Sequence, residues 1–276
     1  MNVSIASINH HTLARRQAKA RNMISSNDPH IRYSTDEGVC IIQIARPEKK
    51  NALTHSMYTA LADGLKDADA DSAVRVILIR GTEDCFTSGN DVNDFVVSEE
   101  RSKERPSVQF MKALASLRKP LIAAVNGLGI GIGTTMLMHC DLVYAAQDSF
   151  LQLPFTRLGL CPEAGSSFLA PNIMGHQRAA ELLLLGERFS ATKAQEYGLV
   201  NEVLEAERVY PHALEKARAL AALPTEAVQT SKHLLKRNQT GALEETISLE
   251  LVNFSRLLQS PEAQAIVQAF LDRKRG

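Results

Sequence analysis

The chain has 276 residues, an apolar content of 45% and equal numbers of basic and acidic side chains, 31 of each. Its length allows a substantial hydrophobic core, and its balanced charge leaves no global field to attract nucleic acid or an anionic membrane, so neither is an expected partner. Its four cysteines are far apart and form no C-x-x-C pair, a pattern typical neither of a disulfide framework nor of a zinc site.

The N-terminal stretch differs from the rest of the chain. Several basic side chains between residues 15 and 21 precede the first acidic one, Asp28. We expect residues 1–29 to form a poorly packed N-terminal extension of a cytoplasmic protein. The same composition loosely resembles a transit peptide, which would instead make the protein mitochondrial.

From residue 38 onward the hydrophobic pattern alternates between strands and helices. This pattern predicts an α/β core over residues 30–220, followed by a helical segment over residues 221–276 that packs on neighbouring subunits. Apolar and β-branched runs predict strands at 39–44, 74–79, 121–125, 142–144, 150–153 and 200–204. Helical spacing predicts helices at 53–70, 107–117, 134–139, 179–185, 191–197, 209–220, 225–237, 242–258 and 261–273.

Several common cofactor and nucleophile motifs are absent. The glycines from Gly127 to Gly133 follow a strand, but the third glycine of a dinucleotide fingerprint would fall on Ile132 or Thr134. The chain has no G-x-x-x-x-G-K-[ST] and no G-x-S-x-G. The run that begins at His139 lacks a completing ligand set, so we expect neither a metal nor a separate cofactor.

Two glycine-containing loops leave predicted strands, at residues 86–91 and 126–133. Each places small residues shortly before a helix, where the first backbone N–H groups have no partner within the helix. Facing one another, the two loops would form a pocket that stabilises an anion. Spacing alone favours ordinary tight turns.

A series of short motifs follows in order along the chain. These motifs are Arg46-Pro47, Asn51-Ala52-Leu53, Phe86 to Asp91, Pro120 to Gly127, Cys140-Asp141, Leu158-Gly159-Leu160, Ala191, Ala194 and Tyr197 to Val200. Taken in this order, they resemble those of the crotonase (enoyl-CoA hydratase/isomerase) superfamily. The resemblance implies a spiral of ββα units, a helical C-terminal trimerisation segment, an acyl-CoA substrate, and a homotrimer or dimer of trimers.

The resemblance also implies site residues. Backbone N–H groups of Asn90 and Ile132 would form an oxyanion hole for the thioester, since that carbonyl oxygen gains charge in an enolate. The remaining implied residues contact the substrate. Ser88 and Val92 would flank the adenine of CoA; Lys49, Lys50, Arg273 and Lys274 would bind its phosphates; and Leu128, Ile130, Phe155 and Leu158 would line the acyl pocket.

Carboxylates distinguish the reactions of this superfamily. Hydratases that it resembles use two glutamates, and this chain has Thr135 and Phe155 at those positions. Glu163 remains, and Pro162 at the first helical position would place it in the first turn of a helix. A glutamate in the first turn of a helix is also favoured by the helix dipole alone, without any catalytic role. The resemblance to peroxisomal-type Δ3,Δ2-enoyl-CoA isomerases implies that Glu163 is the sole acid and base, in an apolar pocket that raises its pKa.

We therefore expect an isomerase that shifts a 3-enoyl-CoA double bond to the 2-position, as in fatty-acid β-oxidation. One alternative is a hydratase-like or other acyl-CoA thioester enzyme on the same fold. A non-catalytic acyl-CoA-binding protein is the other, because fold does not determine function.

Overall fold

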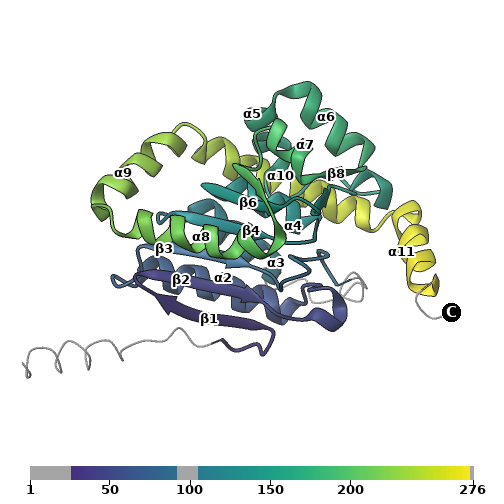
Figure 1. The fold of residues 1–276 in the computed structure, drawn as a ribbon. Coiled ribbons are helices and arrows are strands. Elements are labelled where there is room, and N and C mark those ends of the chain that lie inside the picture. The colour runs from purple at the N-terminus through teal and green to yellow at the C-terminus, as the bar shows by residue number, and fades with distance from the viewer. Residues whose placement is uncertain (1–25, 92–104, 274–276) are drawn as a thin grey trace, which may run out of the picture.

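A computed structural model describes residues 26–91 and 105–273 of the chain (Figure 1). The elements in these ranges are β1 (Ile31–Asp36), β2 (Val39–Ile44), η2 (Pro47–Lys49), α2 (His55–Ala70), β3 (Val76–Arg80), α3 (Pro106–Ser116), β4 (Leu121–Val125), β5 (Leu128–Ile130), α4 (Ile132–Thr135), η4 (Met136–His139), β6 (Leu142–Ala146), β7 (Phe150–Gln152), η5 (Thr156–Leu158), α5 (Ser166–Met174), α6 (His176–Leu185), β8 (Arg188–Ser190), α7 (Ala191–Glu196), β9 (Glu202–Leu204), α8 (Ala206–Ala221), α9 (Thr225–Lys236), α10 (Thr240–Leu258) and α11 (Pro261–Arg273).

The main sheet has the strand order β1-β2-β3-β4-β6-β9, and only its edge pair β1–β2 is antiparallel. Strands such as Leu121–Val125 are buried at every position, as expected for parallel strands covered on both faces. Alternate side chains enter two separate cores. Ile122 and Ala124 pack toward α8, whereas Leu121 and Ala123 belong to the core that includes α2 and α3 (Figure 1).

A second, three-stranded sheet has the order β5-β7-β8. Strand β4 of the main sheet continues into β5 of the small sheet and then into α4, and β6 likewise continues into β7. Two successive strands that belong to different sheets and lead into helical turns are the repeating ββα unit that the resemblance to the crotonase superfamily implies. The carboxyl ends of β4 and β6 therefore lead directly into the segments that build the site.

Several elements differ from the sequence-based prediction. Strand β1 was not predicted, since its alternation of Ser, Thr and charged residues is that of a half-exposed edge strand. The glycine loop contains strand β5, and the helix after it starts at Ile132 and tightens into 3₁₀ geometry at Met136. The most consequential error concerns Glu163, because α5 begins only at Ser166.

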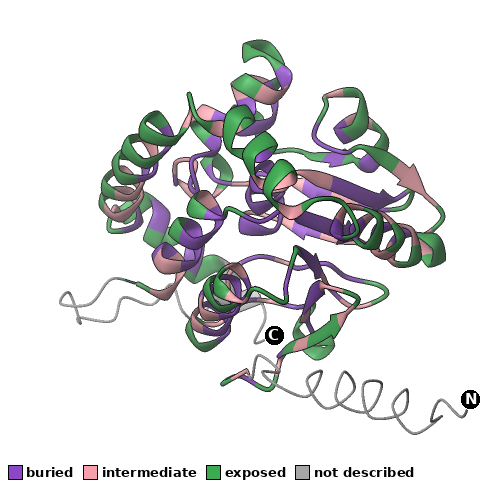
Figure 2. Ribbon diagram, turned by 90° about the vertical axis from the view of Figure 1, so that its left-hand side faces the viewer, coloured by how far each residue is buried: buried purple, intermediate pink, exposed green. Residues whose placement is uncertain are grey.

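The helices of the C-terminal segment contribute to the core of their own chain. Leu243, Ile247 and Leu258 of α10 are buried in the larger core. Buried residues follow the strands and the inner faces of the helices, whereas the outer faces are exposed (Figure 2). Leu235 on α9 and Val252 on α10 are 80% and 68% exposed. The predicted oligomer would cover apolar side chains of this kind, and it stays a prediction.

Asn51 joins its own turn, which starts at Arg46, to the loop at 82–87, and we expect its removal to destabilise the fold. Its fully buried amide accepts the N–H of Arg46 at 2.7 Å and donates to the carbonyl of Cys85 at 2.7 Å. The Asn51→Ala variant leaves these buried groups unpaired, so we expect a loss of about 3 kcal/mol in the free energy of unfolding by urea. The exposed Asn172→Ala variant serves as the control and should lie within about 0.5 kcal/mol of the wild type. Equal stabilities of the two variants would contradict this assignment.

Candidate active site

A cavity of about 780 Å³ opens where the carboxyl ends of the central strands meet the small sheet and the C-terminal helices. This volume suits a small-molecule or cofactor-sized ligand. The residues that line it come from segments far apart in the sequence: Glu48, Lys49, Lys50, Ala52, Ser88, Gly89, Asn90, Asp91, Ile130, Gly131, Ile132, Gln152, Pro154, Phe155, Leu158, Leu160, Glu163, Arg188 and Val267.

The two glycine-containing loops lie side by side at this cavity. The N–H of Thr87 donates to the carbonyl of Leu128 at 3.0 Å, and the N–H of Ile130 donates to the carbonyl of Thr87 at 3.1 Å. These bonds form an isolated parallel bridge between Thr87 and Gly129. The juxtaposition that the sequence could only suggest is therefore present.

The backbone N–H of Asn90 faces the cavity. On either side of Asn90, the carbonyl of Gly89 and the N–H of Asp91 both bond to Leu53, at 2.8 and 2.9 Å. Successive peptide groups of an extended strand point in opposite directions, so the N–H between these two bonds points away from Leu53. Within residues 26–91 and 105–273 it donates to no other group. The Asn90 side chain accepts a hydrogen bond from the Tyr58 hydroxyl.

Ile132 presents the second N–H. It is the first residue of α4, where the backbone N–H has no partner inside the helix. The preceding N–H, that of Gly131, donates to the carbonyl of Gln152 at 2.9 Å, and the helix bonds begin at Thr134. Among the described residues the Ile132 N–H has no acceptor. Two unpaired donors at one cavity can stabilise an oxyanion.

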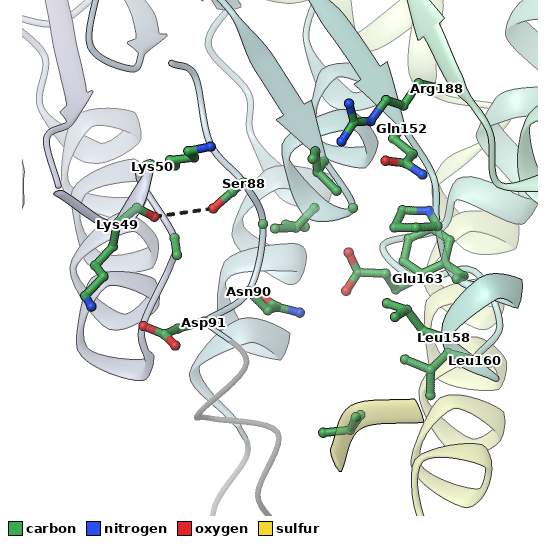
Figure 3. Close-up of a pocket in the computed structure, with 18 of the residues that line it drawn as sticks. Lys49, Lys50, Ser88, Asn90, Asp91, Gln152, Leu158, Leu160, Glu163 and Arg188 are labelled. Carbon is green, nitrogen blue, oxygen red and sulfur yellow. Dashed lines mark hydrogen bonds between the residues drawn. The ribbon is translucent and has the colours of Figure 1, made fainter. Parts of the chain in front are cut away.

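Glu163 points its carboxylate into the cavity, toward the segment that carries Asn90 (Figure 3). The residue is only 4% exposed, and Thr135 donates its hydroxyl to Oε1 at 3.3 Å. Burial, together with the nearby charge of Glu250, raises the pKa of Glu163 to about 8, against a small opposing effect of the Thr135 hydrogen bond. Such a carboxyl group can both donate and accept a proton near neutral pH.

The sequence-based placement of Glu163 in a first helical turn is wrong. Ala164 and Gly165 follow it with φ values of 57° and 73°, both in the left-handed region, so no α-helix can run through them. Helix α5 starts at Ser166, whose N–H and hydroxyl both donate to the Glu163 carbonyl. Glu163 therefore ends an irregular loop rather than stabilising a helix dipole.

The other carboxylates of the cavity differ from Glu163. Asp91 pairs with the Arg46 guanidinium at 2.7 Å, and both side chains are largely buried. Glu48 is exposed at the mouth of the cavity. Among the described residues that line the cavity, Glu163 is the one carboxylate that is buried without an ion-pair partner.

Most of the predicted substrate contacts lie at the cavity. Lys49, Lys50 and Ser88 lie along one side of it (Figure 3). The apolar wall contains three predicted residues, Ile130, Phe155 and Leu158. Leu128 is not among the lining residues; it is the first residue of β5, and its carbonyl accepts the Thr87 N–H. Val92 and Lys274 lie outside the described residues, and Arg273 is the last residue of α11, with its side chain undescribed.

Some lining residues carry no local signal in the sequence. Gln152 and Arg188 form a polar side of the cavity, and Leu160 extends its apolar wall (Figure 3). Val267 lines the same cavity. Leu160 lies in a motif that the sequence analysis quoted without a role. Val267 reaches the cavity because α11 packs beside η5, where Ala263 lies against Gly159. Only tertiary packing brings so distant a residue to the site.

Comparison with known proteins agrees with this architecture. Residues 34–276 match the family model for enoyl-CoA hydratase/isomerase. The chain is 33% identical to 1,2-epoxyphenylacetyl-CoA isomerase of Escherichia coli K12, over 87% of this chain and 94% of that protein. It is also 33% identical to enoyl-CoA delta isomerase 2 of Rattus norvegicus, over 88% of this chain but only 64% of that protein.

Hydratases are also among the relatives. The 2,3-dehydroadipyl-CoA hydratase of E. coli K12 is 30% identical over 87% of this chain and 95% of its own length. Among solved structures, Pseudomonas aeruginosa OdaA matches with a TM-score of 0.85 and 45% identity, over 88% of this chain and 99% of that one. The fold, the paired loops and these relatives together establish that the chain belongs to the enoyl-CoA hydratase/isomerase family, within the crotonase superfamily.

Proposed function

We propose that this protein is a Δ3,Δ2-enoyl-CoA isomerase in which Glu163 is the sole acid and base. The observation that carries the proposal is the single buried, unpaired carboxylate among the described residues of the cavity, opposite two unpaired backbone N–H groups. Relatives named as isomerases and as hydratases match at similar identity, so the proposal rests on the site rather than on a name.

The chemistry needs one proton carrier and one oxyanion site. The Glu163 carboxylate removes a proton from C2 of a 3-enoyl thioester, and the electron pair moves onto the carbonyl oxygen. The N–H groups of Asn90 and Ile132 stabilise the resulting dienolate. Glu163, now protonated, returns the proton to C4, and the double bond ends between C2 and C3. Proton and electron pair are both accounted for, so no other reactant is consumed.

The positions that hold glutamates in hydratases support isomerisation over water addition. Thr135 is buried and donates its hydroxyl to Glu163, and a hydroxyl is not a useful base near neutral pH. Phe155 is an apolar part of the wall. Adding water requires one group to activate the water and another to handle the proton at C2. One buried carboxylate without an ion-pair partner, among the described residues of the cavity, suits a reaction that moves a proton within the substrate.

An assay of both reactions tests the proposal. Conversion of cis- and trans-3-enoyl-CoA to 2-enoyl-CoA is followed spectrophotometrically across chain lengths, and crotonyl-CoA is offered in parallel for hydration. We expect turnover of 3-enoyl-CoA and negligible water addition. Robust hydration would support the hydratase alternative. Binding of CoA esters without turnover of any chain length would support a non-catalytic binding protein.

The pH dependence of the reaction should follow the ionisation of Glu163. The carboxylate must be ionised to take the C2 proton, and its pKa is raised to about 8. The value of kcat/KM should therefore rise with pH up to that value and fall about ten-fold for each unit below it. Because the Thr135 hydrogen bond lowers this pKa, Thr135→Val should move the acid limb to higher pH. A profile that stays flat down to about pH 5 would contradict the assignment of Glu163 as the base.

A further inference from the structure

A second buried carboxylate, that of Glu250, lies behind the loop that carries Glu163. Glu250 belongs to α10 and is 7% exposed, and it is not among the residues that line the cavity. Its Oε2 accepts the N–H of Gly165 at 2.6 Å. Its Oε1 accepts the N–H of Ser167 at 2.9 Å and the Ser167 hydroxyl at 2.5 Å. Glu250, which is far from residue 163 in the sequence, thus accepts three hydrogen bonds from the loop that carries Glu163.

These bonds hold the loop in the conformation that directs Glu163 into the cavity. Ala164 and Gly165 are both in the left-handed region, which is costly for alanine and must be supported by surrounding contacts. Both contacts act on the peptide group that joins Ala164 to Gly165: Glu250 accepts its N–H, and His139 Nε2 contacts its carbonyl at 2.7 Å. This peptide group, which lies between the two left-handed residues after Glu163, is therefore held from two helical elements.

Glu250 also places a charge near Glu163. Burial raises the pKa of Glu250, and the donors from Ser167 and Gly165, which favour the ionised form, oppose that effect only in part. A negative charge there disfavours ionisation of Glu163, in addition to the effect of burial.

Other titratable groups around the two carboxylates do not cancel this effect. Cys161 bonds to the Glu250 carbonyl at 3.7 Å, and burial raises the pKa of its thiol, which keeps it neutral. Burial lowers the pKa of His139 to about 4, so the imidazole is neutral as well. Arg256, further along α10, interacts with Cys161. Thr135 faces Glu163 with a neutral hydroxyl.

We infer that Glu250 is a positioning residue for the proposed isomerase reaction: its carboxylate holds the 163–167 loop in the orientation that directs Glu163 into the cavity, and its charge favours the protonated form that returns the proton to the substrate. The inference rests on the proposed role of Glu163. It gives helix α10 of the C-terminal segment a part in catalysis within its own chain, separate from any role in assembly.

Three variants test the inference on the full chain, with kcat and KM for a 3-enoyl-CoA measured across pH. Glu250→Gln removes the charge and presents an amide N–H₂ to one of the backbone donors. We expect kcat to fall about 10²-fold with little change in KM, because the base is misplaced. We expect the acid limb to move about one unit toward lower pH, because the neighbouring charge is gone. Circular dichroism checks that the variant is folded.

Ser167→Ala is the matched control, since it removes one donor and leaves the charge. Its acid limb should stay at the wild-type pH. Glu250→Asp keeps the charge but withdraws it by one methylene, so kcat should fall while the limb stays close to its wild-type position. If Glu250→Gln does not fold, Glu250→Asp decides, and a wild-type kcat in that variant overturns the inference.

An unmoved acid limb in folded Glu250→Gln would show a merely structural role and would also overturn the inference. This outcome is distinguishable from a failure of the proposed function. Substantial turnover in Glu163→Gln removes the proposed function itself. An inactive Glu163→Gln combined with a wild-type pH profile in Glu250→Gln removes only the role of Glu250.

Discussion

Replacing Glu163 with glutamine should lower the turnover of 3-enoyl-CoA by about 10³–10⁴-fold, the largest effect we expect from a single substitution. Glutamine has nearly the same shape and can still accept the Thr135 hydroxyl, which reaches Oε1 at 3.3 Å in the wild type. It cannot take a proton from C2. Because the cavity has no second buried, unpaired carboxylate among its described residues, no neighbour can substitute for it.

Substrate binding separates this result from a general loss of structure. The affinity for a saturated acyl-CoA, measured by calorimetry, should remain within about three-fold of the wild type, since glutamine preserves the polar contacts of the cavity wall. Glu48→Gln is the control, because Glu48 also lines the cavity but is exposed at its mouth. Near-normal turnover in Glu163→Gln would show that another group moves the proton.

Gly89→Ala should have the second largest effect, a loss of about 10²–10³-fold in kcat, which is the usual cost of losing one oxyanion donor. Gly89 has φ 86°, and a Cβ there would lie 2.6 Å from the carbonyl oxygen of Ile130. Since that oxygen is part of the backbone, either loop must shift. The shift would move the adjacent Asn90 N–H away from the position that the Leu53 hydrogen bonds now determine.

Strain in a left-handed residue must be distinguished from displacement of the oxyanion hole. Gly175→Ala provides this control: Gly175 has φ 82° between α5 and α6, and a Cβ there meets nothing within 4 Å. Both variants should lose about 1 kcal/mol or more in urea unfolding. Only Gly89→Ala should lose kcat. Equal activities of the two variants would contradict the placement of the Asn90 N–H in the oxyanion hole.

The site combines rigid and irregular parts of the fold. The segments that carry the N–H groups of Asn90 and Ile132 are held by two isolated β-bridges, Leu53–Asn90 and Thr87–Gly129, and these bridges restrict movement of the backbone. Glu163 instead lies on a loop of unusual backbone conformation that depends on contacts from α10 and η4. This division suits the proposed reaction, in which fixed N–H donors would stabilise the dienolate and a separately supported carboxylate would move the proton.

Sequence patterns accounted for much of this architecture. Buried strands such as 121–125 were predicted because continuous apolar runs bounded by turn residues have few alternatives. Strand β1 was missed, since an edge strand needs only one apolar face. The helical start at Glu163 was also predicted wrongly. Proline at a first helical position is a local signal, and it was outweighed by left-handed residues 164 and 165 that α10 stabilises from far along the chain.

By itself, the sequence indicated most of the strands and helices and the two glycine loops, because periodicity and glycine spacing are properties of neighbouring residues. Its resemblance to the crotonase superfamily, rather than any local pattern, singled out Glu163. The tertiary structure alone decided that the loops pair through Thr87 and Gly129, that Val267 reaches the cavity and that Glu250 supports the Glu163 loop. Those contacts join residues far apart in the chain. They depend on how the two sheets and the C-terminal helices pack, and no local pattern encodes that packing.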